Sequence, residues 1–144
     1  MKIHWIAGLI VFAFGMAVGA DPASGQDRTP APEGAELYFI SPTDGASVSG
    51  KITVVFGLKG MGVAPAGTAK PATGHHHLLI DTDLPALDEG IPADDQHVHF
   101  GGGQTQTTIM LAPGKHTLQL LLGDMNHVPH DPPVYSRRIV VTVK

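Results

Sequence analysis

Cysteine is absent from the 144 residues, and several kinds of chemistry are excluded with it. A chain without cysteine forms no disulfide, even in an oxidising compartment, and carries no lipidated cysteine. It also has no thiol nucleophile for catalysis.

Positive charge is scarce. The nine Lys and Arg residues are scattered, with only Arg137 and Arg138 adjacent, and the formal net charge is -4. A surface that binds nucleic acid needs clustered cations to neutralise phosphates. The sequence therefore predicts no nucleic acid partner.

Sustained helical periodicity is also lacking. Twelve prolines and eighteen glycines interrupt the chain, and apolar residues recur in short extended runs instead. At this length one compact domain is expected. The composition favours an all-β fold.

Signatures of hydrolytic enzymes are missing as well. No serine lies in a nucleophile-elbow context, and no His-Glu-x-x-His helix is present. Nucleophilic catalysis is therefore not expected.

The first twenty residues have the pattern of a signal peptide. Lys2 and His4 give a short polar start, Trp5 to Val18 form an apolar run, and Val18-Gly19-Ala20 ends in small residues. We expect cleavage after Ala20, a periplasmic or secreted location, and no membrane attachment afterwards. Residues 21–34 are rich in Pro, Ala and Gly and are predicted to be a disordered linker.

The remaining residues, 35–144, are predicted to form one histidine-rich domain. About seven short strand-like runs are separated by turns every 8 to 15 residues, and they cover 36–40, 52–56, 75–82, 97–100, 104–111, 116–122 and 134–143. This spacing is typical of an immunoglobulin-like antiparallel β-sandwich with Greek-key connections.

Seven of the nine histidines fall in three clusters, at 75–77, 97–99 and 127–130. Alternate residues of a strand share a face, so His75 and His77 project together, and His97 and His99 do the same. His76 points the other way, where it is either a core residue or a further ligand. A lone pair leaves a metal under-coordinated, so we expect the two pairs to form one site.

The third cluster supplies His127, His130 and Met125 as assisting ligands. Packing of these rings on neighbouring prolines is an equally reasonable interpretation of this loop. His116 begins a strand after a tight turn, where sandwiches often place a ring that hydrogen-bonds back to the chain. It is interpreted as structural and left out of the site.

The predicted ligand set suits copper or zinc, because imidazole binds both. Met125 lies two residues from His127, and Met61 lies in the loop that leads to His75. Thioether ligation favours Cu(I), so copper is placed before zinc.

Four segments together resemble a bacterial family of small exported domains of unknown function. They are GHHHLLID at 74–81, HFGGGQT at 99–105, LAPGKHTLQLLLGD at 111–124 and HVPHDPPVYS at 127–136. The resemblance spans about residues 35–144 and implies a secreted or periplasmic one-domain protein. It implies no activity.

Two other resemblances cover less of the chain. The segment from His97 to Gly101 is similar to the copper-binding His-Val-His of copper/zinc superoxide dismutases, but the cysteines and bridging histidine of that family have no counterpart. Cupins also use His-x-His, but Gly103 and Gln104 stand where their Glu would be. A metal-dependent enzyme, superoxide-dismutase-like or with a two-His, one-carboxylate site, remains an alternative, and so does a sandwich module that binds a non-metal ligand or a protein partner.

Overall fold

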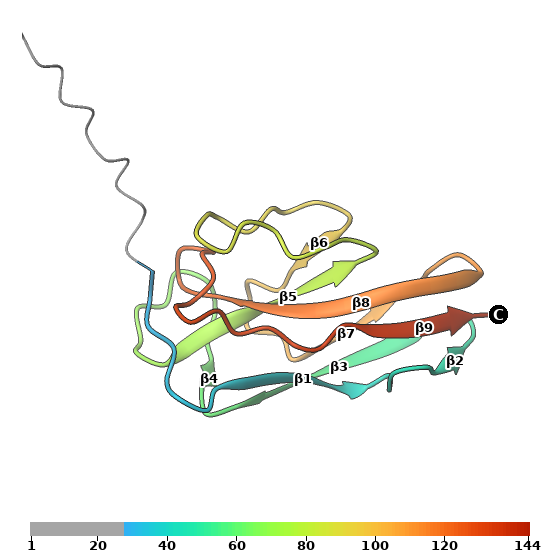
Figure 1. Cartoon of the computed structure of the whole chain (residues 1–144), viewed down its shortest axis with the longest axis horizontal. Helices are drawn as coiled ribbons and strands as arrows, with labels where there is room; N and C mark the ends of the chain where they lie inside the picture. Colours follow the sequence, from blue (N-terminus) through green and yellow to red (C-terminus); the bar gives the residue numbers. More distant parts are fainter. Residues whose placement is uncertain (1–27) are drawn as a thin grey trace, which may run out of the picture.

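A computed structural model describes residues 28–144 and shows a two-layered β-sandwich (Figure 1). Within these residues nine strands form and no helix. The strands are β1 (Glu36–Ser41), β2 (Ser47–Val48), β3 (Ile52–Lys59), β4 (Gly62–Val63), β5 (Thr73–Ile80), β6 (His97–His99), β7 (Gln106–Ile109), β8 (Gly114–Gly123) and β9 (Ile139–Val143). The predicted all-β sandwich is confirmed.

The smaller sheet has three antiparallel strands in the order β1-β3-β7. Its central strand alternates as the sequence suggests, with Ile52, Val54 and Phe56 buried and Thr53 exposed. Period-2 alternation turns one face toward the core and the other toward solvent.

The larger sheet follows the order β2-β9-β8-β5-β4, with β6 also paired to β5. Antiparallel pairing was predicted throughout, but β2 pairs with β9 and β4 with β5 in parallel. Both exceptions involve two-residue strands, which were too short to be expected from the sequence. They account for the larger number of strands.

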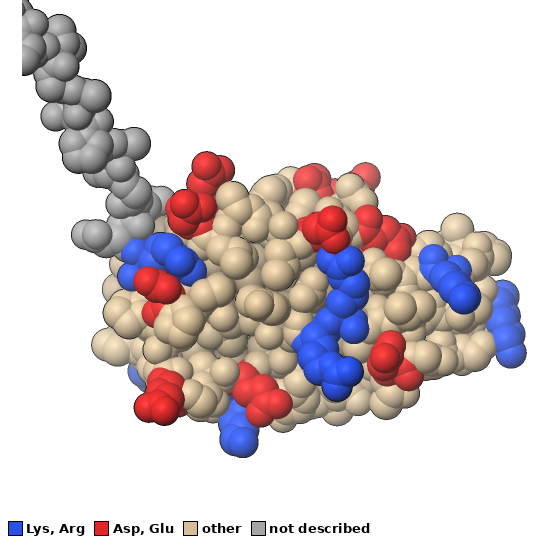
Figure 2. Space-filling view, in the orientation of Figure 1, with Lys and Arg blue, Asp and Glu red and all other residues tan. Residues whose placement is uncertain are grey.

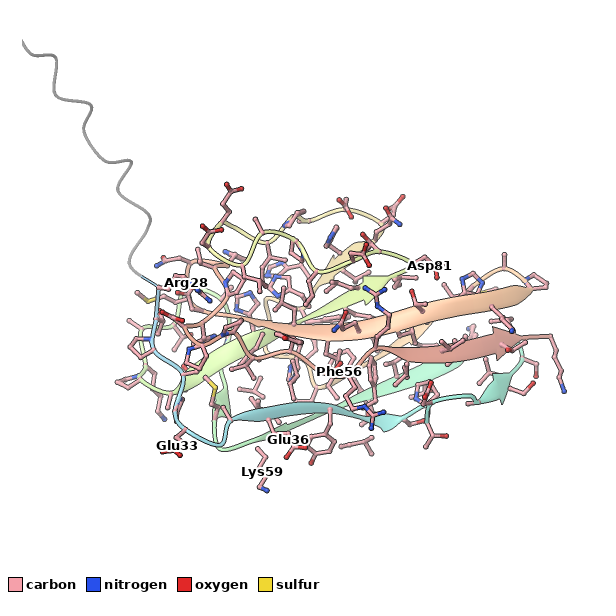
Figure 3. The ribbon with its side chains drawn as sticks, in the orientation of Figure 1. Arg28, Glu33, Glu36, Phe56, Lys59 and Asp81 are labelled. Carbon is pink, nitrogen blue, oxygen red and sulfur yellow. The ribbon has the colours of Figure 1, made fainter. Side chains whose placement is uncertain are left out.

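The main core lies between the two sheets. Phe56 occupies this interior (Figure 3), and its ring lies 4.9 Å from that of Phe100. Leu78, Leu120 and Val141 of the larger sheet are fully buried against it. Because burying each such side chain contributes about 1.5–3 kcal/mol, this interior fixes the position of β5.

The second face of β5 is covered as well. Leu79 and Leu121 form a smaller apolar cluster with Ile91, which belongs to the segment between β5 and β6. Seven of the eight residues of β5 are consequently buried, from Thr73 to Leu79. Side chains on both faces of this strand are thus shielded from water.

The structure corrects part of the predicted linker. Residues 28–34 were expected to be disordered, but Thr29 and Ala31 exchange backbone hydrogen bonds with Asp131. Pairing with the carboxyl-terminal loop gives this segment a fixed place that its composition does not reveal. The predicted signal peptide and residues 21–27 lie outside the described residues. Among residues 28–144, no helix is long and apolar enough to cross a membrane.

Candidate metal centre

Four imidazoles gather on the face of β5 that is turned away from the main core. His75 and His77 come from β5, His99 ends β6, and His127 lies in the loop after β8. The six separations between ring centroids run from 4.6 to 6.3 Å. We call these four residues the histidine cluster.

Strand alternation and register produce most of this cluster. His77 is paired with His99 across β5 and β6, so their side chains project on the same face. His77 and His99 stack, with centroids 5.0 Å apart. The predicted common projection of His75 and His77 places their rings 4.8 Å apart.

The fourth ring belongs to His127, whose backbone has an unusual conformation. His127 has a φ of 65°, in the left-handed region that few residues other than glycine adopt. Its amide donates to the carbonyl oxygen of Asp124 at 3.0 Å, and its own carbonyl accepts from the amide of Ile91 at 2.8 Å. These two bonds hold the turn and direct the ring to within 4.9 Å of His75.

Two glycines make room for the rings. A Cβ on Gly101 would lie 2.4 Å from Cε1 of His99, and a Cβ on Gly123 would lie 2.8 Å from Cε1 of His77. Neither separation is compatible with a side chain at the glycine while the ring stays in place. Gly101 and Gly123 therefore complete the site without contributing a ligand.

Burial differs within the cluster. His75 and His77 are completely or almost completely buried, His127 is partly buried, and His99 is exposed. The site therefore has a buried part on β5, formed by His75 and His77 and here called its floor. Its solvent-facing side is formed by His99 and His127.

Burial also sets the protonation of the floor. Burial, and after it the charges of the neighbouring imidazoles, lower the pKa of His75 to about 4 and that of His77 to about 3. Burial and then His127 also lower the pKa of His99. These histidines are neutral at pH 7, which is the form that binds a metal.

Several ring nitrogens of the floor have no hydrogen-bond partner. Both nitrogens of His75 and Nδ1 of His77 are buried and unpaired. A buried polar group without a partner costs about 1–3 kcal/mol. A metal ion bound here would take up lone pairs that nothing else uses.

The cluster has the dimensions that such an ion needs. The ligand nitrogens of His75, His77 and His99 lie within 4.8 Å of one another, and they would close to about 3.3 Å around a tetrahedral ion with metal–nitrogen bonds of about 2.0 Å. Ring centroids in that arrangement are about 5 Å apart, close to five of the six separations in the histidine cluster; His77 and His127 are farther apart, at 6.3 Å. The residues present therefore fit a metal ion with imidazole ligands.

The structure does not bring every predicted ligand into this group. His97 shares the face of His99 but pairs with Leu79, and its Nδ1 lies 2.8 Å from the Asp94 carboxylate. His130 is completely buried elsewhere, where its Nε2 donates to the Thr73 carbonyl oxygen at 3.1 Å. Met125 is 39% exposed and lines a separate surface cavity.

His76, the optional ligand, lies on the core face, where its ring is 5.0 Å from that of Phe56. Its nitrogens are also unpaired, but none of the four residues of the histidine cluster is on that face. Burial lowers the pKa of His76 to about 4. This placement is the core alternative considered from the sequence.

His116, interpreted as structural, is held by two hydrogen bonds. Its Nδ1 lies 2.6 Å from the Asp81 carboxylate, and its Nε2 donates to the Ala112 carbonyl oxygen at 2.8 Å. The bond to Asp81 raises the pKa of His116. Both ring nitrogens are thus occupied within the protein.

Fold and site together define a β-sandwich domain with a histidine-lined centre on the outer face of one sheet. The chain belongs to the family described as Domain of unknown function (DUF4399), whose model matches residues 54–144. The four histidines of the cluster all lie within the matched residues. No curated protein and no solved structure gives a significant match.

Proposed function

We propose that this domain is an exported protein that binds one transition-metal ion through His75, His77, His99 and His127. The observation that carries the proposal is the convergence of His75, His77 and His99, whose ligand nitrogens lie within 4.8 Å of one another. The ring of His127 lies beside them, with its centroid 4.9 Å from that of His75 and 4.6 Å from that of His99. The unpaired buried nitrogens of His75 and His77 support it. Surface histidines without a ligand would be hydrated instead.

Copper(II) is the preferred ion and zinc(II) the alternative. Imidazole suits both, and Cu(II) is placed first because it binds more tightly than Zn(II) in the usual order of divalent ions. Tetrahedral coordination is the geometry of zinc, which keeps zinc(II) as the alternative. Support for Cu(I) is weaker, because Met61 packs against the main core and Met125 lines a separate cavity. Neither thioether belongs to the cluster.

Binding or handling of the ion is favoured over catalysis. With His127 as the fourth ligand beside His75, His77 and His99, a tetrahedral ion would have no open position, whereas catalytic zinc sites keep one. The nearby carboxylates are engaged elsewhere: Asp94 with His97 and Asp124 with Thr29. A two-His, one-carboxylate site thus has little support in the geometry.

The exposed surface suits a cation. Acidic side chains lie along the edge of the molecule that carries the segment between β5 and β6 (Figure 2). That segment includes Asp88, Glu89 and Asp95, all exposed. A negative rim raises the local concentration of positive ions.

The export part of the proposal rests on the apolar run from Trp5 to Val18 and the small residues that follow it. Mass spectrometry of the processed protein is expected to give a chain that begins at Asp21. An intact first segment in an exported preparation would contradict it.

Titration of the metal-free protein tests the metal site. Cu(II), Zn(II) and Cu(I) are each added, with native mass spectrometry to count bound ions. One ion per chain is expected, and the electron paramagnetic resonance spectrum of the Cu(II) form should show nitrogen ligands. Affinities no tighter than about millimolar for all three ions would overturn the proposal.

A further inference from the structure

The segment Arg28–Ala31, here called the strap, crosses the loop that follows β8. The Arg28 guanidinium donates to the carbonyl oxygens of Pro129 and His130 and lies 3.5 Å from the Asp131 carboxylate. Ala31 donates to the Asp131 carbonyl oxygen at 3.0 Å. Arg28 lies where the described chain meets the body of the domain (Figure 3).

The strap also reaches a buried carboxylate. The Thr29 hydroxyl donates to Oδ2 of Asp124 at 2.6 Å, and Asp124 is only 2% exposed. Burial raises the pKa of Asp124, but the hydrogen bonds from Thr29 and from the amides of Val128 and Asn126 outweigh it and hold this pKa below its usual range. The carboxylate is therefore charged and depends on its donors.

Asp124 in turn organises the turn that carries His127. Its Oδ1 accepts from the amides of Asn126 at 2.8 Å and Val128 at 3.0 Å, one on each side of His127. Its carbonyl oxygen accepts from the amide of His127 itself. Since the left-handed φ of His127 is unfavourable without support, these bonds keep its ring in the cluster.

We propose that Thr29 and Asp124 are positioning residues for His127, so that the strap sets how tightly the histidine cluster holds its metal. The proposal rests on the proposed function. Thr29 touches none of the four rings and acts through the carboxylate alone. The strap precedes residues 54–144, so a segment outside the family match would tune the site.

Replacement of Thr29 tests this relation in the full processed chain. Thr29→Val keeps the shape and removes the donor, Thr29→Ser restores it, and Thr53→Val is the matched control on the exposed face of β3. Loss of a partner of this kind weakens metal binding about tenfold to a hundredfold. We expect about a tenfold loss of Cu(II) affinity for Thr29→Val, recovery for Thr29→Ser and no change for Thr53→Val.

Three further measurements separate positioning from general destabilisation. In the metal-free protein, hydrogen exchange at the amides of Asn126 and Val128 should accelerate in Thr29→Val and not in Thr29→Ser. In the Cu(II) form, the resonance spectrum of Thr29→Val should show fewer nitrogen ligands. In a His127→Ala background, Thr29→Val should cost no further affinity.

The outcomes distinguish the two proposals. If the unaltered chain binds no metal, the proposed function fails and the inference fails with it. If it binds metal but Thr29→Val has the same affinity, or the same loss persists in the His127→Ala background, only the inference is overturned. Unchanged exchange at Asn126 and Val128 would also overturn it.

Discussion

The rings of His99 and His127 lie 4.6 Å apart, although one ends a strand and the other lies in a left-handed turn. These two rings form the solvent-facing side of the cluster, opposite the buried rings of His75 and His77. The four residues therefore behave as one unit, and their substitutions should not act independently.

Non-additivity is the expected sign of such a unit. His77→Ala should remove most of the Cu(II) or Zn(II) affinity, and addition of His99→Ala should cost little more. His97→Ala is the matched control, because His97 faces the same side but pairs with Asp94. Calorimetric titration measures the affinities of the unaltered chain, of His77→Ala, of His99→Ala, of the double variant and of His97→Ala. Independent losses that add, or a loss for His97→Ala as large as for His77→Ala, would contradict a single site.

Glycine replacements should damage the site through crowding. Gly101→Ala places a methyl group against the His99 ring, and Gly123→Ala places one against the His77 ring. Both are expected to weaken metal binding about tenfold or more. Gly90→Ala is the control, since nothing lies within 4 Å of its added Cβ. Unchanged affinity in both variants, with the fold intact by circular dichroism, would show that the rings need not lie where the structure places them.

Stability of the metal-free protein should fall in acid. Burial holds the pKa of His75 and His76 at about 4 and that of His77 at about 3, whereas unfolded histidine titrates near about 6.5. Below about pH 6.5 the unfolded chain binds more protons and is favoured, until the folded groups titrate. Each group contributes at most about 1.4 kcal/mol per pH unit.

Urea unfolding in the presence of a chelator measures this effect between about pH 7.5 and about pH 4.5. His76→Leu should flatten the pH dependence by removing one of the three groups. A midpoint that stays constant over the range would show that these imidazoles do not remain neutral in the folded protein.

His116→Ala should affect stability without affecting the metal. The substitution removes the bonds to Asp81 and Ala112, and we expect a loss of about 1–2 kcal/mol of unfolding free energy. Metal affinity should remain that of the unaltered chain. A marked loss of affinity would assign His116 a place in the site that its hydrogen bonds do not indicate.

The sequence predicted the β-sandwich. It also predicted which histidines of β5 project together and which one projects to the opposite face. Alternation alone separates His75 and His77 from His76, because successive residues of a strand point to opposite faces. It could not decide between His97 and His99. That choice depends on the register of β6 against β5, which places His99 opposite His77 and His97 opposite Leu79.

The loop ligands were harder to assign for a different reason. His127 and His130 look equivalent in the sequence, but a left-handed turn held by Asp124 directs only His127 to the cluster. His130 is drawn to Thr73. The place of residues 28–31 also depends on long-range hydrogen bonds, and no composition pattern signals them.

Strand β5 carries the main core on one face and the histidine cluster on the other. Insertion or deletion of a single residue between His75 and Leu79 would exchange the two faces for the residues that follow it. Leu78 would then turn toward the cluster, and His77 would turn toward the main core in its place, if the extra or missing residue lay before them. A change of one residue within this strand would thus disrupt both the core and the set of metal ligands. A change in the length of the segment between β5 and β6 would leave each side chain of β5 on its present face.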